Sequence, residues 1–438
     1  MAIDITTKKN LSAEFSEKAG CKQADIGFFP RDWEIKKFNK IGQVIDGDRG
    51  VNYPSSNHFL LDGDCLFLSA KNVTKKGFKF NDCVFISKDR DSLLGQGKLK
   101  MWDVVLTTRG TVGNFAYFDS AVPFENIRIN SGMVILRKES DKVVKEYLYE
   151  ILKSQIIENQ ICRVVFGSAQ PQLTVKIVNN LQVPYPEDKF EQTAIATVLS
   201  DTDVLIGRLE KLIAKKKDIK QGTMQQLLTG KKRLPGFSGE WEVMSFDQIV
   251  SRTTGAWGSQ DCDDNHSRCA EIIRAGDISS EGMLMATALR FLSEVEFSKA
   301  RCHLDDLVIT TSGTGLGKVW WCDGRANVVA SNFVRVLCPI KSKAQGRFLF
   351  YVLRSEEALR QLHEHTATSA YPNLRLSFFS ARWVSLPSVS EQAAIATVLS
   401  DMDVEIESLE QKRNKYVMLK QGMMQQLLTG KIRIHANN

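Results

Sequence analysis

The chain nearly repeats one segment of its own sequence after 200 residues. Residues 191–230, EQTAIATVLSDTDVLIGRLEKLIAKKKDIKQGTMQQLLTG, and residues 391–430, EQAAIATVLSDMDVEIESLEQKRNKYVMLKQGMMQQLLTG, are identical at 26 of 40 positions. Solenoid repeats have periods of roughly 20 to 50 residues, so this longer period indicates two copies of a whole domain followed by a helix. We therefore interpret the chain as a pseudo-dimer within one polypeptide.

Each copy of the repeat has the spacing of a long helix. Its seam positions alternate by four and three residues, a pattern that helices bury against one another; they are Ile195, Leu199, Thr202, Ile206, Leu209 and Ile213, and then Ile395, Leu399, Met402, Ile406 and Leu409. Proline is absent from residue 190 to residue 234, which allows one helix of about 38 residues, about 57 Å long. We expect the two near-copies to pair as an antiparallel coiled coil, with a pair of ordinary core helices as the alternative.

Glycines mark two places in each predicted helix. Gly222 and Gly422 lie inside it, where glycine costs about 1 kcal/mol relative to alanine, so their presence in both copies suggests a close backbone approach or a bend. The sequences Thr-Gly-Lys at residues 229–231 and 429–431 are typical of helix ends, because glycine adopts the left-handed conformation after the last turn.

The segments before the two helices share a weaker skeleton. LSAKNVTKKG from Leu68 matches IIRAGDISSEG from Ile272, and WDVVLTTRGTVG from Trp102 matches LDDLVITTSGTGLG from Leu304. Farther on, QPQLTV at residues 170–175 matches YPNLRL at residues 371–376. Short β-rich runs between glycines predict a mixed α/β domain with a substantial sheet in each half. A shared skeleton with different loop residues is what two distinct binding surfaces on one scaffold would produce.

Composition restricts the class of protein. The 438 residues are 43% hydrophobic and 25% charged, as in ordinary globular domains, and the net charge of +7 is compatible with nucleic acid but also serves solubility alone. Nine scattered cysteines, with neither a signal peptide nor a membrane-spanning apolar run, predict a reducing cytoplasm. The polar segment 1–29 is expected to be a short arm.

Possible catalytic and metal motifs are weak. GTGLGKV from Gly313 lacks the spacing of a phosphate-binding loop, since Val319 follows Lys318 where serine or threonine is required. The cluster Cys262, His266 and Cys269 lacks the paired spacing of zinc modules. We therefore expect the chain to carry neither a catalytic site nor a metal.

Several short motifs, taken together and in their duplicated order, match a known family. They are the LTTRGTVG and ITTSGTGLG turns, the QPQL and YPNL elements, the proline-to-EQ entries at 186–191 and 387–391, and the QxLLTGK helix ends. In these features the chain resembles the DNA-specificity subunit of type I restriction–modification systems, from about residue 32 to residue 431.

The resemblance implies a fold and a division of the chain. The fold would be α+β, with two mixed α/β target-recognition domains separated by two long helices in an antiparallel, pseudo-two-fold coiled coil. The expected parts are an N-terminal arm at 1–29, recognition domain 1 at 30–185, a central helical region at 186–234, recognition domain 2 at 235–386 and a C-terminal helical region at 387–438.

The resemblance also implies a function and partners. The chain would be non-catalytic, would read an asymmetric bipartite site in double-stranded DNA, and would fix the gap between the half-sites. Two methyltransferase subunits would supply S-adenosylmethionine and methylate adenine at N6, and two motor-nuclease subunits would supply ATP and Mg for restriction of foreign DNA. The alternatives are a related system whose methyltransferase and nuclease share one partner chain, an enzyme with a pocket in one domain, and a coiled-coil scaffold that binds proteins.

Residues in or beside the predicted turns are the candidates for contact with DNA. Arginine and lysine suit guanine, and asparagine and glutamine suit adenine. In domain 1 the candidates are Lys71, Asn72, Arg109, Thr111, Ser168, Gln170 and Gln172, and in domain 2 they are Arg274, Asp277, Ser312, Thr314, Lys318, Tyr371 and Asn373. Since Arg109 is aligned with Ser312, and Gln170 with Tyr371, we expect the two half-sites to differ.

Overall fold

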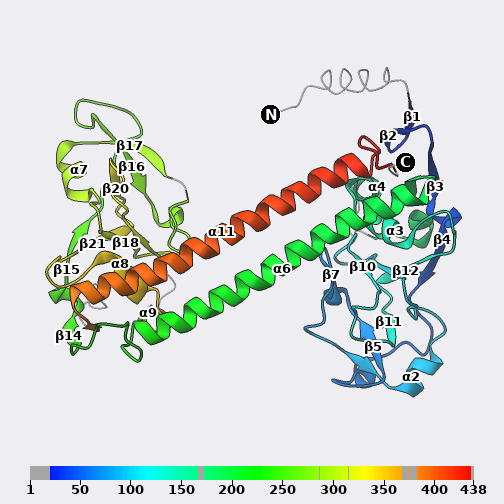
Figure 1. Cartoon of the computed structure of the whole chain (residues 1–438), viewed down its shortest axis with the longest axis horizontal. Coiled ribbons are helices and arrows are strands. Elements are labelled where there is room, and N and C mark those ends of the chain that lie inside the picture. Colours follow the sequence, from blue (N-terminus) through cyan, green and yellow to red (C-terminus); the bar gives the residue numbers. More distant parts are fainter. Residues whose placement is uncertain are drawn as a thin grey trace. The chain divides into compact units, whose positions relative to one another are not determined.

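The computed structural model describes residues 20–165, 172–285, 287–313, 315–366, 374 and 382–435 (Figure 1). The chain divides into two compact units, Met1–Arg208 with Arg413–Asn438, and Leu209–Lys412. We call them unit 1 and unit 2. Among the residues so described, none of the helices is long and apolar enough to cross a membrane.

In its described residues, domain 1, the part of unit 1 from β1 to β13, has two main sheets and three two-stranded ribbons, β1-β2, β3-β13 and β6-β7. Its elements are β1 (Cys21–Ala24), β2 (Gly27–Pro30), β3 (Trp33–Lys37), η1 (Phe38–Lys40), β4 (Gly42–Asp46), η2 (Ser56–His58), β5 (Cys65–Leu68), η3 (Ala70–Asn72), β6 (Val73–Thr74), β7 (Gly77–Phe78), β8 (Phe85–Ile86), α2 (Lys88–Leu93), β9 (Val104–Thr107), β10 (Phe115–Tyr117), β11 (Ile127–Ile129), β12 (Met133–Lys138), α3 (Lys145–Leu152), α4 (Gln155–Val165), α5 (Val175–Asn179) and β13 (Gln182–Pro186). The larger sheet has the order β10-β9-β12-β4, and the smaller has the order β11-β5-β8.

Domain 2, the part of unit 2 from β14 to β22, repeats this plan. Its elements are β14 (Glu242–Ser245), η4 (Phe246–Gln248), β15 (Val250–Thr254), β16 (Arg268–Ile273), η5 (Ala275–Asp277), β17 (Ala288–Leu292), α7 (Glu294–Ala300), β18 (Leu307–Thr310), β19 (Val319–Trp321), β20 (Val328–Ala330), β21 (Val334–Pro339), α8 (Gly346–Leu353), α9 (Glu356–Thr366) and β22 (Trp383–Leu386). Its main sheets have the orders β15-β21-β18-β19 and β17-β16-β20, and β14 pairs with β22 in a two-stranded ribbon. The predicted mixed α/β domain in each half is confirmed.

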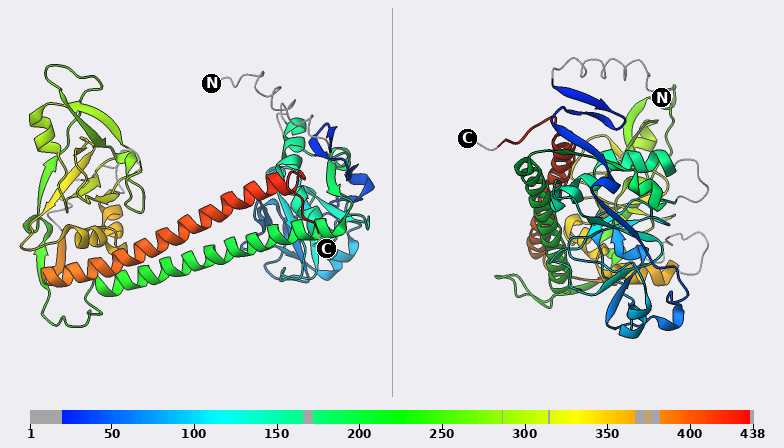
Figure 2. Two further views of the ribbon diagram at one scale, coloured as in Figure 1. Left: turned by 45° about the horizontal axis from the view of Figure 1, so that its top comes forward. Right: turned by 90° about the vertical axis from the view of Figure 1, so that its right-hand side faces the viewer.

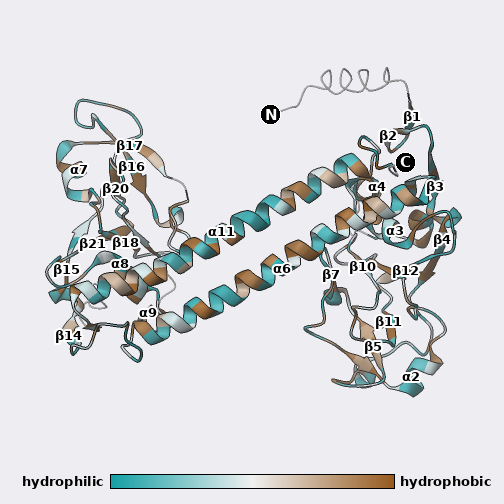
Figure 3. Ribbon diagram, in the orientation of Figure 1, coloured by the Kyte–Doolittle hydropathy of each residue, from teal (hydrophilic) through white to brown (hydrophobic). Residues whose placement is uncertain are grey.

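The two long helices are α6 (Lys189–Leu227) and α11 (Val389–Leu427), each of 39 residues. Hydrophobic and hydrophilic residues alternate along both of them (Figure 3). In unit 1, Ile195 and Leu199 of α6 lie in the core of domain 1, together with Leu427 from the end of α11. Ile395 and Leu399 of α11 lie likewise in the core of domain 2 in unit 2. The first seam residues of each helix therefore pack against a domain as well as against the other helix.

Ion pairs show that the helices run antiparallel within each unit. In unit 1, Lys420 of α11 pairs with Asp203 of α6, and Figure 2 shows these helix segments side by side. In unit 2, Lys220 of α6 pairs with Asp403 of α11. The two pairs are related by the 200-residue repeat. In unit 2, Lys216 also pairs with Glu405, and in unit 1, Arg433 beyond the end of α11 pairs with Glu191 near the start of α6. Later residues of one helix therefore meet earlier residues of the other, and the predicted antiparallel pairing is found in both units.

The repeated glycines have different roles. Gly230 and Gly430 both have φ of +69°, the left-handed conformation predicted for the helix ends. A Cβ atom at Gly430 would overlap the ring of Pro30 in unit 1. Around Gly222 and Gly422, by contrast, a Cβ atom would meet nothing within 4 Å. A close backbone approach at Gly222 and Gly422 is therefore not found among the described residues, and a bend, the other expected explanation, stays a prediction.

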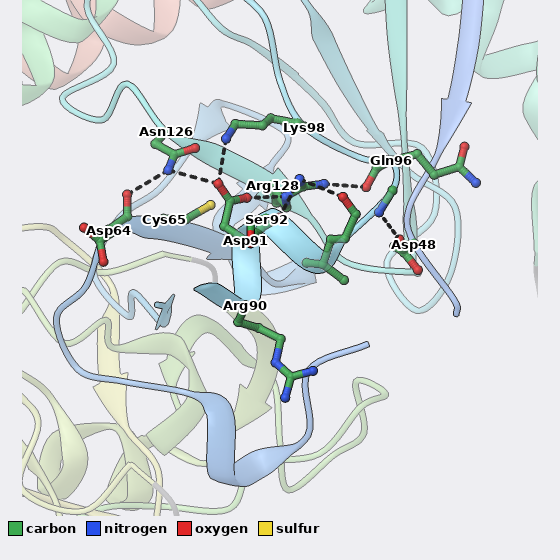
Figure 4. Close-up of polar contacts among 12 residues, drawn as sticks. Asp48, Asp64, Cys65, Arg90, Asp91, Ser92, Gln96, Lys98, Asn126 and Arg128 are labelled. Atoms are coloured by element: carbon green, nitrogen blue, oxygen red, sulfur yellow. Dashed lines mark hydrogen bonds and ion pairs between the residues drawn. The ribbon is translucent and has the colours of Figure 1, made fainter. Parts of the chain in front are cut away.

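A buried ion pair stabilises the smaller sheet of domain 1 (Figure 4). Arg128 on β11 and Asp91 in α2 have side chains that are 7% and 8% exposed, and they form a salt bridge. Lys98 Nζ lies 2.6 Å from the same carboxylate, and Arg128 also donates to the carbonyl oxygens of Leu94 and Gln96. Every charge in this cluster is therefore compensated by a partner, as burial requires.

Domain 2 fills the equivalent space with apolar side chains. Asp91 lies four residues after the cap Ser87, and Phe297 lies four residues after the cap Ser293 of α7. Phe297 is 2% exposed and packs in one cluster with Val329, which occupies on β20 the place that Arg128 has on β11. The same scaffold therefore tolerates either an ion pair or a hydrophobic contact at this point.

We predict that Asp91→Asn destabilises the chain by about 3–5 kcal/mol, because it leaves the Arg128 charge buried without its partner. The double variant Asp91→Phe/Arg128→Val copies domain 2. It should be more stable than either of its component single variants, Asp91→Phe and Arg128→Val. Urea unfolding of the full-length chain measures this order. If the double variant were the least stable of the three, the proposed equivalence of the two sites would be wrong.

The ion pair also makes a pH-dependent contribution. Burial raises the pKa of Asp91, but hydrogen bonds from Lys98 and Arg128 outweigh burial and lower the pKa from 3.8 to about 2. Because the folded-state pKa is depressed, this stabilisation is complete above pH 4 and is lost as the pH falls toward 2. The Asp91→Phe/Arg128→Val variant should lack that component of the acid sensitivity.

Candidate nucleic-acid interface

Three loops of domain 1 leave the same end of its larger sheet. The antiparallel register pairs Thr107, the last residue of β9, with Met133, the first residue of β12. It also pairs Val134 with Asp46, the last residue of β4. The β9–β10 turn, the β11–β12 turn and the loop after β4 therefore emerge together. We call residues 47–50, 69–72, 108–114, 130–132 and 172–174 loop cluster 1.

Hydrogen bonds hold this cluster together. The backbone N–H groups of Thr108 and Arg109 donate to the carbonyl oxygen of Gly132 at 2.8 and 3.2 Å. The N–H of Leu173 donates to the carbonyl oxygen of Thr108 at 3.0 Å, and Arg109 forms a β-bridge with Gln172. Two predicted contact residues, Arg109 and Gln172, thus lie beside each other, and both are exposed.

The first predicted turn is part of the same cluster, but only one of its two candidates is accessible. The side-chain amide of Asn114, in the β9–β10 turn, donates to the carbonyl oxygen of Val73 at 3.0 Å, which brings the turn at 69–72 alongside. Lys71 is exposed, as is Thr111 in the β9–β10 turn. Asn72, however, is 1% exposed, and its side-chain amide forms hydrogen bonds with the backbone of Ser69, Lys79 and Asp82.

The corresponding turn of domain 2 has the same construction. Asp277 is 6% exposed and accepts hydrogen bonds from the backbone and side chain of Arg274. Asn72 and Asp277 are therefore turn-forming residues, and their selection as base-contacting groups does not agree with their burial. A polar residue three positions after the start of a short turn has a local role that could have been recognised from the sequence. Arg274 is half-exposed and is paired with that carboxylate at 3.0 Å.

Loop cluster 2, defined as residues 255–258, 274–278, 310–313, 315–318, 331–333 and Leu374, is built in the same way. Thr310, the last residue of β18, pairs with Val334, the first residue of β21. Thr311 donates its N–H to the carbonyl oxygen of Phe333 at 3.2 Å and accepts from the N–H of Leu374 at 2.7 Å. Ser312 is half-buried. Lys318 donates from Nζ to the carbonyl oxygen of Ile278 at 2.9 Å.

The remaining candidate residues lie outside the part of the chain that the structure describes. They are Ser168 and Gln170 in domain 1, and Thr314, Tyr371 and Asn373 in domain 2. The contact roles predicted for these five, and for the exposed candidates above, stay predictions.

The structure adds residues that the sequence did not single out. Arg49, after β4, is exposed and donates to the carbonyl oxygen of Ser131 at 3.2 Å, so it belongs to loop cluster 1. In loop cluster 2, Trp257 is 62% exposed and Phe333 is 50% exposed, and their ring centroids are 5.1 Å apart. A tryptophan between two glycines after a β-rich run was the only signal in the sequence for this pair.

The weak zinc motif of domain 2 consists of Cys262, His266 and Cys269. Cys262 and Cys269 are both exposed. His266 bonds the carboxylate of Asp263 at 3.0 Å. Within the described ranges, no group of three or more His, Cys, Asp or Glu side chains is arranged to hold a metal ion.

The two loop clusters offer exposed hydrogen-bonding, cationic and aromatic side chains at equivalent sheet ends. Such side chains can reach the base edges of a duplex, while lysine and arginine can also contact phosphates. The clusters differ in character, since cluster 1 presents Arg49 and Arg109 where cluster 2 presents Trp257 and Ser312. The repeated scaffold therefore presents two unlike surfaces at equivalent sheet ends.

Comparison with known proteins identifies two copies of one domain type in the chain. The family model for the type I restriction modification DNA specificity domain matches it twice, over residues 30–221 and 238–417. The MjaVIII type I specificity subunit of Methanocaldococcus jannaschii is 25% identical over 433 residues, covering 92% of this chain and 94% of that protein. The EcoKI specificity subunit of Escherichia coli is 21% identical and covers 92% of this chain and 89% of its own length.

The fold agrees with solved structures. The S subunit of a type I restriction–modification system from M. genitalium superposes with a TM-score of 0.59 at 14% identity, covering 90% of this chain and 96% of that one. A structure that describes assembly of a type I restriction–modification system superposes with a TM-score of 0.52, also at 14% identity. Because the family model matches both domains and most of both long helices, the chain belongs to the family of type I restriction–modification DNA specificity subunits.

Proposed function

We propose that this chain selects the DNA sequence for a type I complex by reading two different half-sites, one with each loop cluster. The observation that carries the proposal is the pair of loop clusters, which occupy equivalent sheet ends but carry different side chains. Arg109 in cluster 1 has Ser312 as its counterpart. Arg49, two residues after Gly47, has Trp257, two residues after Gly255, because both glycines lie against the equivalent turn of their domain. Two identical surfaces would read a symmetric site, whereas these favour an asymmetric, bipartite one. The two 39-residue helices would keep the gap between the half-sites constant.

The chain would act without catalytic chemistry of its own. We propose that two methyltransferase subunits bind S-adenosylmethionine and methylate adenine at N6, and that two motor-nuclease subunits bind ATP and Mg and cleave unmodified DNA. In this proposal the complex works in the cytoplasm as a defence against foreign DNA. The site for each cofactor lies on a partner, because the role of this chain is to choose the sequence.

Exposed apolar side chains that recur on the two long helices support the binding of two copies of one partner. Val204 and Val404, which are equivalent in the repeat, are 51% and 62% exposed, and Ile219 and Leu419 are 43% and 50% exposed. Exposed apolar groups that recur on a surface mark interaction sites. Gly222 and Gly422 leave open space beside each helix, which suits close approach of another backbone. Two equivalent surfaces favour two copies of one partner, which we propose to be the methyltransferase.

Co-expression with the cognate methyltransferase should produce N6-methyladenine at a split, asymmetric motif in the host genome. Single-molecule sequencing maps the motif. Replacing residues 30–185 with those of a relative should then change one half of the motif and leave the other half intact. A continuous motif, or a change in both halves, would contradict the assignment of one half-site to each domain.

Arg109→Ala should weaken binding to the cognate half-site of domain 1 by about 5- to 150-fold if the guanidinium contacts a base edge, because a good bidentate contact is worth about 1–3 kcal/mol. Binding of the methyltransferase complex to duplexes with single base changes, measured by fluorescence anisotropy, should show lost discrimination in that half-site alone. Lys36→Ala, on the β3–β13 ribbon, is the matched control. Equal effects of the two variants would indicate only a general electrostatic contribution.

Gly222→Leu and Gly422→Leu should each reduce binding of the methyltransferase without unfolding the chain. Leucine fills the open space beside the helix and is a better helix former than glycine by somewhat under 1 kcal/mol. Co-purification measures assembly, and thermal unfolding of the isolated chain measures stability. Gly207→Leu is the control, since a Cβ atom there also meets nothing within 4 Å but the second copy has glutamate at that position. Unchanged co-purification of all three variants would exclude these glycines from the interface.

A further inference from the structure

The aromatic pair in loop cluster 2 occupies places that have other residues in domain 1. Gly47 and Gly255 follow β4 and β15, and at both a Cβ atom would overlap the backbone of the neighbouring turn, at Asn130 and Ser331. Because these glycines align the two loops, Trp257 corresponds to Arg49. The register of β20 and β21 likewise places Phe333 where domain 1 has Gly132. An arginine and a glycine in one cluster are thus replaced by two large aromatic rings in the other.

The two rings are held in place although they are exposed. Their planes meet at 89° with centroids 5.1 Å apart, an edge-to-face arrangement that is favourable for aromatic pairs. The carbonyl oxygen of Phe333 accepts hydrogen bonds from both the N–H and the hydroxyl of Thr311, at 3.2 and 3.1 Å. Phe333 is therefore anchored beside the turn that carries Ser312, one of the residues predicted to contact DNA.

The surroundings of the pair suit a nucleic acid. Trp257 lines a cavity of about 470 Å³ together with Lys299, Arg335 and Asn332. Glu296, the acidic residue of this cavity, accepts hydrogen bonds from the N–H and hydroxyl of Ser293, at 3.1 Å each. Its carboxylate is therefore engaged in capping α7. In such a combination of cations and an apolar surface, the cationic side chains can contact phosphates while the apolar surface contacts bases.

We propose that Trp257 and Phe333 read a thymine in the half-site of domain 2 by packing against its C5 methyl group. The inference rests on the proposed function and adds the base that this cluster selects. Along the groove edges of the four bases, the thymine methyl is the apolar group that such a surface can recognise. Domain 1, with Arg49 and Arg109 at the equivalent sheet end, presents hydrogen-bond donors that suit guanine.

The test uses the complex of the full chain with its methyltransferase, and duplexes that carry its mapped recognition motif. Each thymine of the motif is replaced in turn by deoxyuridine, which removes the methyl group and keeps base pairing. We expect one position, in one half-site, to weaken binding by about fourfold, which corresponds to about 0.8 kcal/mol for a buried methyl group. A scan in which no position in either half-site is sensitive, or a domain 2 half-site without thymine, would overturn the proposal.

Variants then assign the effect to the aromatic pair. Trp257→Ala and Phe333→Ala should each abolish the difference between thymine and deoxyuridine at that position, while the domain 1 half-site is still read. Trp383→Ala is the matched control, because Trp383 is another exposed tryptophan of domain 2, 65% exposed on the β14–β22 ribbon. It should retain the fourfold difference.

Three further outcomes separate this inference from the proposed function. Sensitivity to deoxyuridine that persists in Trp257→Ala would overturn the inference and leave the function intact. Loss of partner binding in Trp257→Ala, with unchanged base discrimination, would identify a protein contact and would also overturn it. A complex that methylates no bipartite motif at all would overturn the proposed function and the inference together. If Trp257→Ala fails to fold, Trp257→Leu keeps an apolar side chain there, and the scan on the unmodified chain still decides.

Discussion

The core of each domain includes the C-terminal end of the long helix that follows the other domain in the sequence. In unit 1, Leu427 and Leu428 of the α11 segment are 6% and 0% exposed within the core of domain 1. In unit 2, Met224 and Leu227 of α6 have the same role in domain 2. Arg433, beyond the end of α11, donates two hydrogen bonds to the carboxylate of Glu191 on α6, at 2.7 and 2.9 Å. These hydrogen bonds raise the pKa of Arg433 well above its usual range. Burial of these helix ends is the constraint on which the domains, and so the loop clusters, depend.

The repeated scaffold separates stability from recognition. The space filled by Asp91 and Arg128 in domain 1 is filled by Phe297 and Val329 in domain 2, and the strand order around it is unchanged. A buried ion pair and a well-packed apolar contact of similar volume are comparable in stability when each is complete. The cores can therefore diverge while the sheet ends keep their places. Different side chains at equivalent sheet ends are what allow one fold to read two sequences.

Much of the candidate interface could be predicted from the aligned turns, but not all of it. Arg109 and Gln172 were identified because they lie in loops that recur in order, and the structure brings them together. Asn72 and Asp277 are wrong choices as contact residues, because a polar residue three positions after the start of a short turn caps that turn, a local role that its position in the sequence already indicates. Trp257 and Phe333 were missed, since residues 76 positions apart become neighbours only through the pairing of β15 with β21.

The sequence by itself determined the two-copy architecture, the antiparallel pairing of the long helices and the left-handed glycines at their ends. They follow from the 200-residue repeat, from the four-and-three spacing of the seam residues and from the preference of glycine for the left-handed conformation. All three can be read from the order of the residues. Only the tertiary structure decided which loops share a sheet end, which polar residues are buried and which aromatic rings remain exposed. Strand register and core packing bring distant segments together, and neither can be inferred from the residues of one segment alone.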